Sequence, residues 1–281
     1  MIDPPPAQGD RRVDLHSHTI FSDGMLTPEE LVARATARRL AAIAVTDHDS
    51  VEGLPRAIAA AGAEIEVLPG IEISSEMEGA DLHVLGFFVD VTSTTLLERL
   101  RQFHAERLQR VETILGRLRE LGAPVAFDAV MALAGPGVVG RPHIAEALLR
   151  AGHVTTLDDA FRRFLGAYAP AFVARPAFRT EDAIALIHDA GGVSVLAHPG
   201  ASMSDSAIER LRAAGLDGIE IWHPQHGANT VLRFRALAGR LGLLESGGSD
   251  FHAVGRGADL GDLPIPFEIV GKLRQAAGAA H

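Results

Sequence analysis

The chain has 281 residues and a mass of 29.7 kDa, which suits one large domain or a domain with a modest insertion. Its formal net charge of −10 argues against a long basic groove for duplex nucleic acid. The absence of cysteine excludes disulfides and thiolate metal sites, and Lys272, the only lysine, leaves no P-loop or Schiff-base mechanism. No apolar run is long enough to span a bilayer and no secretory signal is visible, so we expect a cytoplasmic protein without a membrane partner.

Short apolar runs alternate with helical patterns along most of the chain. Residues 1–10 are rich in proline, and we expect them to form a disordered N-terminal extension. The strand candidates are near-continuous apolar runs, typical of strands buried on both faces of a parallel sheet. They cover residues 13–15, 43–46, 67–71, 82–89, 193–197, 218–222 and 243–247. Seven such strands with crossover helices predict an α/β protein with a (β/α) barrel.

The intervening helices carry start signals. Thr27-Pro28-Glu29-Glu30 combines an N-cap threonine, a proline at the first helical position and a glutamate three residues after the cap. Thr180 and Ser204 are predicted to cap two later helices in the same way.

One long stretch interrupts the alternation. Residues 96–175 are helical in pattern, beginning with an amphipathic segment over residues 97–121. We therefore predict a barrel formed by residues 11–95 and 176–275, with a helical insertion at 96–175 between the fourth and fifth strands. We expect this insertion to cover the mouth of the active site.

Histidines and carboxylates stand at or within six of the seven predicted strands or directly after them. They are His16, His18, Asp23, His48, Glu72, His83, His198, Asp250 and His252. In a parallel barrel the carboxyl ends of all strands open onto one face, so these side chains would converge. A single histidine at a strand end is more often a core or surface residue. Coincidence is a poor explanation for such residues at six strands.

The residue types indicate divalent metal ions. Neutral imidazole and carboxylate suit zinc, manganese and iron, and the two histidines of a His-x-His pair on a strand point the same way. Six histidines and three carboxylates exceed the four to six ligands of one ion. The set therefore predicts a site for two or three ions, in which a carboxylate such as Glu72 bridges two of them.

These motifs resemble the PHP (polymerase and histidinol phosphatase) domain over nearly the whole chain. The matching segments are His16-Ser17-His18, Ser22-Asp23-Gly24, Thr46-Asp47-His48-Asp49, Pro69-Gly70-Ile71-Glu72, His83, Ala197-His198-Pro199 and Gly248-Ser249-Asp250-Phe251-His252. Gly140-Arg141-Pro142-His143 and His83-Val84-Leu85-Gly86 further resemble the stand-alone bacterial enzymes that dephosphorylate nucleoside 3′,5′-bisphosphates. Relatives of those enzymes trim short RNAs from the 5′ end.

The resemblance implies a distorted seven-stranded TIM-like barrel, the PHP fold, and a trinuclear centre commonly filled by manganese, with iron or zinc as alternatives. One ion would take His16, His18, Glu72 and Asp250. A second would share Glu72 and add His83 and His198, and the third would take Asp23, His48 and His252. Glu72, Asp250 and His198 are the residues we expect to be catalytic.

Substrate contacts are expected outside the ions. Arg141 and His143 lie on the insertion, Arg175 is at its exit, and His223 follows the sixth strand. Arginine suits bidentate phosphate recognition. Asp47 is predicted to orient His48, and Trp222 to stack on a base or to belong to the core.

The sequence therefore predicts a metal-dependent phosphoesterase that removes the 3′-phosphate of a nucleoside 3′,5′-bisphosphate, with 5′→3′ trimming of short oligoribonucleotides as an extension. Its partners would be small phosphorylated nucleotides or short oligonucleotides, with no long duplex and no obligate protein partner. The alternatives are a phosphatase of a small metabolite such as histidinol phosphate, a polymerase-associated PHP exonuclease or accessory module, and a non-catalytic metal-binding scaffold.

Overall fold

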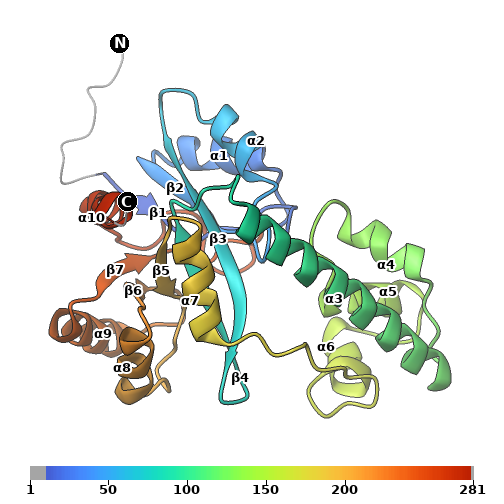
Figure 1. The fold of residues 1–281 in the computed structure, drawn as a ribbon. Helices are drawn as coiled ribbons and strands as arrows, with labels where there is room; N and C mark the ends of the chain where they lie inside the picture. The colour runs from blue at the N-terminus through green and yellow to red at the C-terminus, as the bar shows by residue number, and fades with distance from the viewer. Residues whose placement is uncertain (1–10, 280–281) are drawn as a thin grey trace. The chain divides into compact units, whose positions relative to one another are not determined.

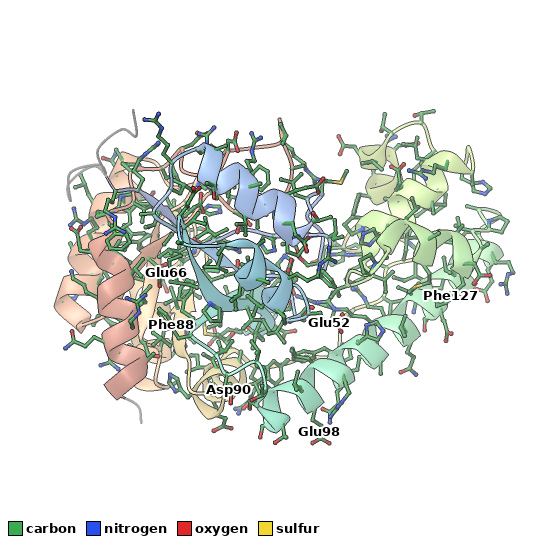
Figure 2. All side chains as sticks on the ribbon, turned by 90° about the horizontal axis from the view of Figure 1, so that it is seen from above. Glu52, Glu66, Phe88, Asp90, Glu98 and Phe127 are labelled. Carbon is green, nitrogen blue, oxygen red and sulfur yellow. The ribbon has the colours of Figure 1, made fainter. Side chains whose placement is uncertain are left out.

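A computed structural model describes residues 11–279, which form two compact units. Within these residues, unit 1 comprises residues 11–97 and 178–279, and unit 2 comprises Glu98–Ala177. Figure 2 labels Glu98, where unit 2 begins, and Phe127, the first residue of its second helix. The predicted disorder of residues 1–10 lies outside the described residues.

Unit 1 is built on one seven-stranded sheet whose strands follow one another in chain order (Figure 1). The strands are β1 (Val13–Asp14), β2 (Ala42–Val45), β3 (Glu66–Met77), β4 (Ala80–Phe87), β5 (Val193–Leu196), β6 (Gly218–Trp222) and β7 (Leu244–Gly247). The two edge strands also approach each other: the amide of Leu15, directly after β1, donates to the carbonyl of Gly247, the last residue of β7, at 3.1 Å. The sheet is thus a nearly closed barrel, and the predicted α/β fold class is confirmed.

The barrel is mixed, so the expectation that all strands are parallel is wrong for β4. β3 and β4 form an antiparallel hairpin, and β4 also pairs antiparallel with β5. The cause is the two-residue turn Glu78-Gly79, in which both residues have positive φ, 55° and 81°. Such turns match the twist of an antiparallel hairpin. β3 is also longer than predicted, because it continues past the metal-ligand candidate Glu72 toward this turn.

Five of the helices of unit 1 lie between these strands in sequence, and α10 follows the last strand, β7. They are α1 (Pro28–Ala37), α2 (Leu54–Ala60), α7 (Thr180–Asp189), α8 (Asp205–Ala213), α9 (Ala228–Leu241) and α10 (Glu268–Ala279). The predicted cap of α1 is confirmed: Thr27 and Glu30 form a capping box, with Pro28 at the first turn. Ser204 caps α8, as predicted. Thr180 is not a cap, because α7 begins one residue earlier than predicted and the Thr180 hydroxyl is buried against Ser75.

Unit 2 is helical, as its pattern predicts. Its long helix α3 (Thr94–Glu120) begins in unit 1, and α4 (Phe127–Ala134), α5 (Arg141–Arg150), α6 (Leu157–Ala160) and the π-helical turn η2 (Phe161–Leu165) follow. One apolar cluster that includes Ile114, Leu118, Val130, Ile144 and Leu165 holds these helices together. None of the helices in residues 11–279 combines the length and apolar character needed to cross a membrane.

Candidate metal centre

Glu72, on β3, is the centre of the candidate site and is fully buried. Its Oε1 atom lies 2.8 Å from Nδ1 of His83 and 3.0 Å from Nε2 of His198. These two histidines come from β4 and from the end of β5. The antiparallel direction of β4 therefore still brings His83 to the site, because the side chain lies within the strand rather than at its end.

The other oxygen of Glu72 faces a different set of histidines. Oε2 lies 3.3 Å from Nε2 of both His16 and His18, and 3.0 Å from Nδ1 of His48. Burial lowers the pKa of His48 to about 4, which favours the neutral imidazole that binds metals. The two oxygens of one carboxylate thus divide the surrounding histidines into two groups.

Asp250, which follows β7, approaches the same group. Its Oδ1 lies 3.4 Å from Nε2 of His16 and 3.2 Å from Nε2 of His18. Burial opposes ionisation of Asp250, but His16 and the neighbouring histidines hold its pKa well below the ordinary value. These histidines therefore favour the ionised form of Asp250.

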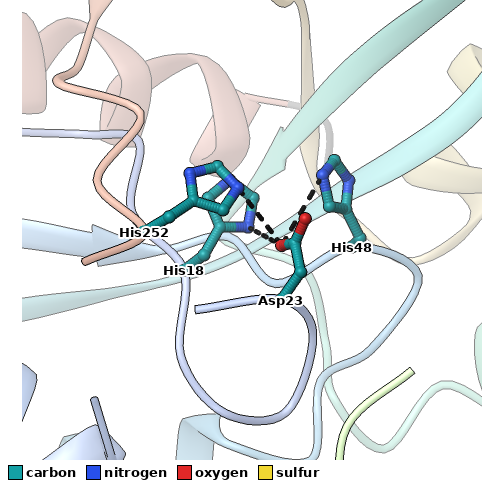
Figure 3. Close-up of side chains that lie close together, drawn as sticks. All are labelled: His18, Asp23, His48 and His252. Atoms are coloured by element: carbon teal, nitrogen blue, oxygen red, sulfur yellow. Dashed lines mark ion pairs between the residues drawn. The ribbon is translucent and has the colours of Figure 1, made fainter. Parts of the chain in front are cut away.

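A second cluster surrounds Asp23 (Figure 3). Its Oδ1 lies 3.2 Å from Nε2 of His252, 3.9 Å from Nδ1 of His18 and 4.0 Å from Nε2 of His48. These four residues come from the loop after β1, the end of β2 and the loop after β7. Together their ligand atoms lie within 4.8 Å of one another.

The polar atoms that face inward fit a cation. Several have no hydrogen-bond partner although they are buried: Nε2 of His16 and His18, Nδ1 of His48, Oε2 of Glu72 and Oδ1 of Asp23. Such atoms are costly to bury unless something else satisfies them. Imidazole nitrogen and carboxylate oxygen are both ligands of first-row divalent metals, so the donor set fits such ions.

Within residues 11–279, three overlapping groups of ligand atoms lie close enough together to hold an ion. They are His18, Asp23, His48 and His252; His16, His18 and Glu72; and His48, Glu72 and His83. The grouping differs from the expected ligand sets, because His18 adjoins the Asp23 cluster and His48 joins Glu72 and His83. Two expected ligands, Asp250 and His198, belong to none of the three groups.

Glycine and unusual backbone angles let the ligands come this close. A Cβ atom on Gly248 would lie 2.2 Å from Cβ of His16, and one on Gly24 would lie 2.4 Å from the carbonyl oxygen of His18. His198 and Asp250 have positive φ values of 24° and 53°. Non-glycine residues seldom adopt such values, and they concentrate at functional sites.

Buried carboxylates outside the cluster hold its loops. Asp47 accepts hydrogen bonds from the amide and hydroxyl of Thr19 and from the hydroxyl of Ser22, so it organises the loop that carries Asp23. The prediction that Asp47 orients His48 is therefore wrong, since its oxygens face that loop. Asp14 accepts from the amides of Ser249 and Gly261. Sequence reasoning missed Asp14, although a charged residue inside an apolar strand is a signal.

The four predicted substrate residues fall in different places. His223 is buried in unit 1, with Nε2 3.4 Å from Oδ2 of Asp250. Arg141 and His143 belong to the first turn of α5 in unit 2, where Nδ1 of His143 accepts from the amide of Gly140. Arg175 is half-buried near the end of unit 2. Substrate binding by these residues stays a prediction.

Two side chains left unassigned by the sequence have clear surroundings. Trp222 packs against the buried cluster of unit 1 and lies beneath the guanidinium of Arg235. Glu220, on β6, is fully buried and contacts His16 and the backbone of His198. A glutamate inside the apolar run of this strand was the signal for its importance.

A nearly closed α/β barrel with this buried set of histidines and carboxylates defines a metal-dependent enzyme. The chain is 38% identical to 3′,5′-nucleoside bisphosphate phosphatase of Chromobacterium violaceum, over 90% of this chain and 92% of the relative. It is 37% identical to the 5′-3′ exoribonuclease Rnm of Escherichia coli, over 85% and 84% of the two chains. A candidate metal-dependent phosphoesterase of Bifidobacterium adolescentis, solved by crystallography, superposes with a TM-score of 0.85 at 33% identity and covers 96% of each chain.

The profile of the PHP domain matches residues 14–172. The chain therefore belongs to the PHP-domain family of metal-dependent phosphoesterases. The predicted family and the predicted enzyme class are confirmed.

Proposed function

We propose that this enzyme removes the 3′-phosphate of a nucleoside 3′,5′-bisphosphate with the help of three divalent cations, Mn²⁺ in the first place and Fe²⁺ or Zn²⁺ as alternatives. The observation that carries the proposal is the division of histidines between the two oxygens of the buried Glu72. The similarity to the bisphosphate phosphatase over nine-tenths of both chains supports the substrate class.

The proposed ligand sets follow this division. Oε2 of Glu72 would join His16, His18 and Asp250 on one ion. Oε1 would join His83 and His198 on a second. Asp23, His48 and His252 would hold the third ion. Because His48 also faces Glu72, it would link the third set to the bridging carboxylate.

The side chains would supply orientation and charge to the reaction. When bound, divalent ions lower the pKa of water toward neutrality and neutralise the charge of phosphoryl oxygens. Glu72 is fully buried and Asp250 is partly buried, and as carboxylates they would fix the ligand positions. His198 would have to be neutral to bind an ion through Nε2. This arrangement leaves no need for a separate general base.

Specificity for a second phosphate would come from Arg141, His143 and Arg175 of unit 2. These residues belong to the helical insertion at 96–175, which we propose as the cover of the active site. His223 would assist from unit 1. Arginine recognises phosphate through two parallel hydrogen bonds, which gives orientation as well as affinity. The similarity to the exoribonuclease supports a second activity, 5′→3′ trimming of short RNAs.

A panel of phosphate esters tests the proposal. Metal-free protein is reloaded with Mn²⁺, Fe²⁺ or Zn²⁺ and given adenosine 3′,5′-bisphosphate, histidinol phosphate, a 5′-phosphorylated short RNA or a DNA duplex. We expect phosphate release from the bisphosphate to exceed that from histidinol phosphate at least about tenfold in kcat/KM. A preference for histidinol phosphate, or no hydrolysis of any ester with any of the ions, would reject it.

Two substitutions on α5 test the proposed role of Arg141 in phosphate binding. Arg141→Ala should raise KM for the bisphosphate about tenfold or more, the effect of losing one charge-assisted hydrogen bond. Arg150→Ala, on the exposed end of α5 where Arg150 pairs with Glu146, is the control. An unchanged KM in the first variant would remove Arg141 from the proposed site.

A further inference from the structure

Glu220 is a carboxylate at the edge of the candidate centre with no assigned role. It lies in β6, the one strand that supplies no expected metal ligand, and its side chain is fully buried. Its Oε1 lies 3.0 Å from Nδ1 of His16. Its Oε2 accepts a hydrogen bond of 2.7 Å from the backbone amide of His198. Each oxygen therefore contacts a different candidate ligand.

The contact with His16 determines where the proton of the imidazole sits. An ionised carboxylate only accepts hydrogen bonds, so Nδ1 of His16 carries the hydrogen and donates it to Glu220. In the neutral ring, Nε2 is then left with a free lone pair. That atom is buried without a hydrogen-bond partner and faces Glu72 and Asp250. Glu220 thus presents His16 as a ligand toward the centre.

The contact with His198 fixes a backbone rather than a ring. His198 has a φ of 24°, outside the regions that a histidine ordinarily occupies. Such a conformation persists only where its surroundings enforce it. The hydrogen bond to Oε2 of Glu220 holds the amide of His198 in place, while its Nε2 reaches Oε1 of Glu72 at 3.0 Å.

The segment after β6 supports the same loop. The amide of Gly200, two residues beyond His198, donates to Nε2 of His226 at 3.2 Å. Nδ1 of His226 in turn donates to the carbonyl of Ile221 at 2.9 Å, which fixes a neutral His226. Both hydrogen bonds tie the loop after β5 to β6, next to Glu220.

We propose that Glu220 is a positioning residue that orients His16 and His198 for two different metal ions. This inference rests on the proposed metal site. Glu220 is not itself proposed as a ligand, because one of its oxygens accepts from His16 and the other from the amide of His198. Partners that orient a ligating histidine in this way typically change metal affinity or activity 10–100-fold when they are replaced.

Two substitutions separate this role from simple packing. Glu220→Gln keeps the size of the side chain, but its amide has one acceptor and one donor group. Either its NH₂ group faces the amide of His198, or it faces Nδ1 of His16 and forces the proton onto Nε2, the ligand atom. Glu220→Asp keeps the charge and both acceptors but leaves a gap. The proposal predicts that Mn²⁺ affinity falls from the wild type to Glu220→Asp and falls further in Glu220→Gln. A packing role instead predicts that Glu220→Gln is the milder change.

The experiment measures Mn²⁺ binding to purified, metal-free protein from the electron paramagnetic resonance signal of free Mn²⁺, with circular dichroism to confirm folding. We expect Glu220→Gln to bind at least one ion about 10–100-fold more weakly than wild type. Glu245→Gln is the matched control, the same change on neighbouring β7, where Glu245 pairs with Arg235. It should bind Mn²⁺ like the wild type.

The outcomes distinguish the two proposals. If the wild type binds no Mn²⁺ and hydrolyses no phosphate ester, the proposed function fails. If the wild type binds Mn²⁺ but Glu220→Gln binds it as tightly, or more tightly than Glu220→Asp does, only the positioning role is overturned. Should Glu220→Gln not fold, Glu220→Asp decides: wild-type stoichiometry with an affinity within about tenfold supports the role, and any larger loss of affinity or the loss of an ion overturns it.

Discussion

Gly248 offers a demanding test of the close approach between the segments that follow the edge strands β1 and β7. It follows β7 and precedes Asp250, and a Cβ atom there would lie 2.2 Å from Cβ and 2.4 Å from the backbone nitrogen of His16. These neighbours are the root of a ligand side chain and its backbone, so no flexible side-chain end can move aside. Gly248→Ala must therefore push the chain around His16 and Asp250 apart.

The size of that displacement follows from the contact distance. An ordinary contact begins at 3.4 Å, so the two segments would separate by about 1.2 Å if the shift is not shared. A misplacement of about 1 Å in a reacting constellation costs roughly 100-fold in rate. Overpacking of this kind also lowers the free energy of unfolding by about 1–3 kcal/mol. We expect both effects in Gly248→Ala.

The assay compares Mn²⁺ content, kcat/KM on the bisphosphate and urea-induced unfolding in two alanine variants. Gly239→Ala is the control, because Gly239 is exposed within α9 and nothing lies within 4 Å of an added Cβ. That change should leave activity unaltered and raise the free energy of unfolding by about 0.5–1 kcal/mol. If Gly248→Ala keeps wild-type metal content and activity within about threefold, the contact does not constrain the site.

Three further predictions concern the cluster and its supports. Glu72→Gln should lower metal content together with activity, the latter by at least about 100-fold, and full activity would contradict the bridging role. Asp47→Ala should lower the free energy of unfolding by about 1–3 kcal/mol in chemical denaturation, because the amide and hydroxyl of Thr19 lose their partner; an unchanged value would refute this. The hydrogen bond to Asp217 raises the pKa of His188, so their pair stabilises fully below the ordinary histidine pKa of about 6.5 and loses this effect as pH rises through the raised value. His188→Ala should therefore reduce stability more at about pH 5.5 than at about pH 9, and equal losses at both would exclude the pair as the cause.

Most of what the sequence could predict about the sheet and the candidate site came from the ends of the strands. Apolar runs followed by His16, Glu72 or Asp250 identify both the sheet and the residues that converge on it, because strand periodicity and ligand chemistry are local properties. The direction of β4 was missed, since its prediction depended on the turn Glu78-Gly79, which was not read as a hairpin signal.

Contacts between distant segments were beyond such reasoning. Glu220 meets the amide of His198, and Asp47 meets Thr19, only after the strands are in register. A buried carboxylate in an apolar strand signals a partner without naming it. Thr180 failed as a cap for a related reason, because burial against Ser75 competes with capping for the same hydroxyl.

The choice of histidine as the partner of the buried acids has a physical reason. A fully buried carboxylate such as Glu72 requires a paired positive charge or a cation. Arginine would neutralise it permanently, whereas histidine can carry a proton or, once neutral, donate the same nitrogen to a metal. Although burial disfavours a charged ring, the carboxylate of Asp23, 3.2 Å away, raises the pKa of His252 to about 9. A proton on His252 can thus neutralise Asp23 in the metal-free fold, and a cation would take over that role at the same atoms.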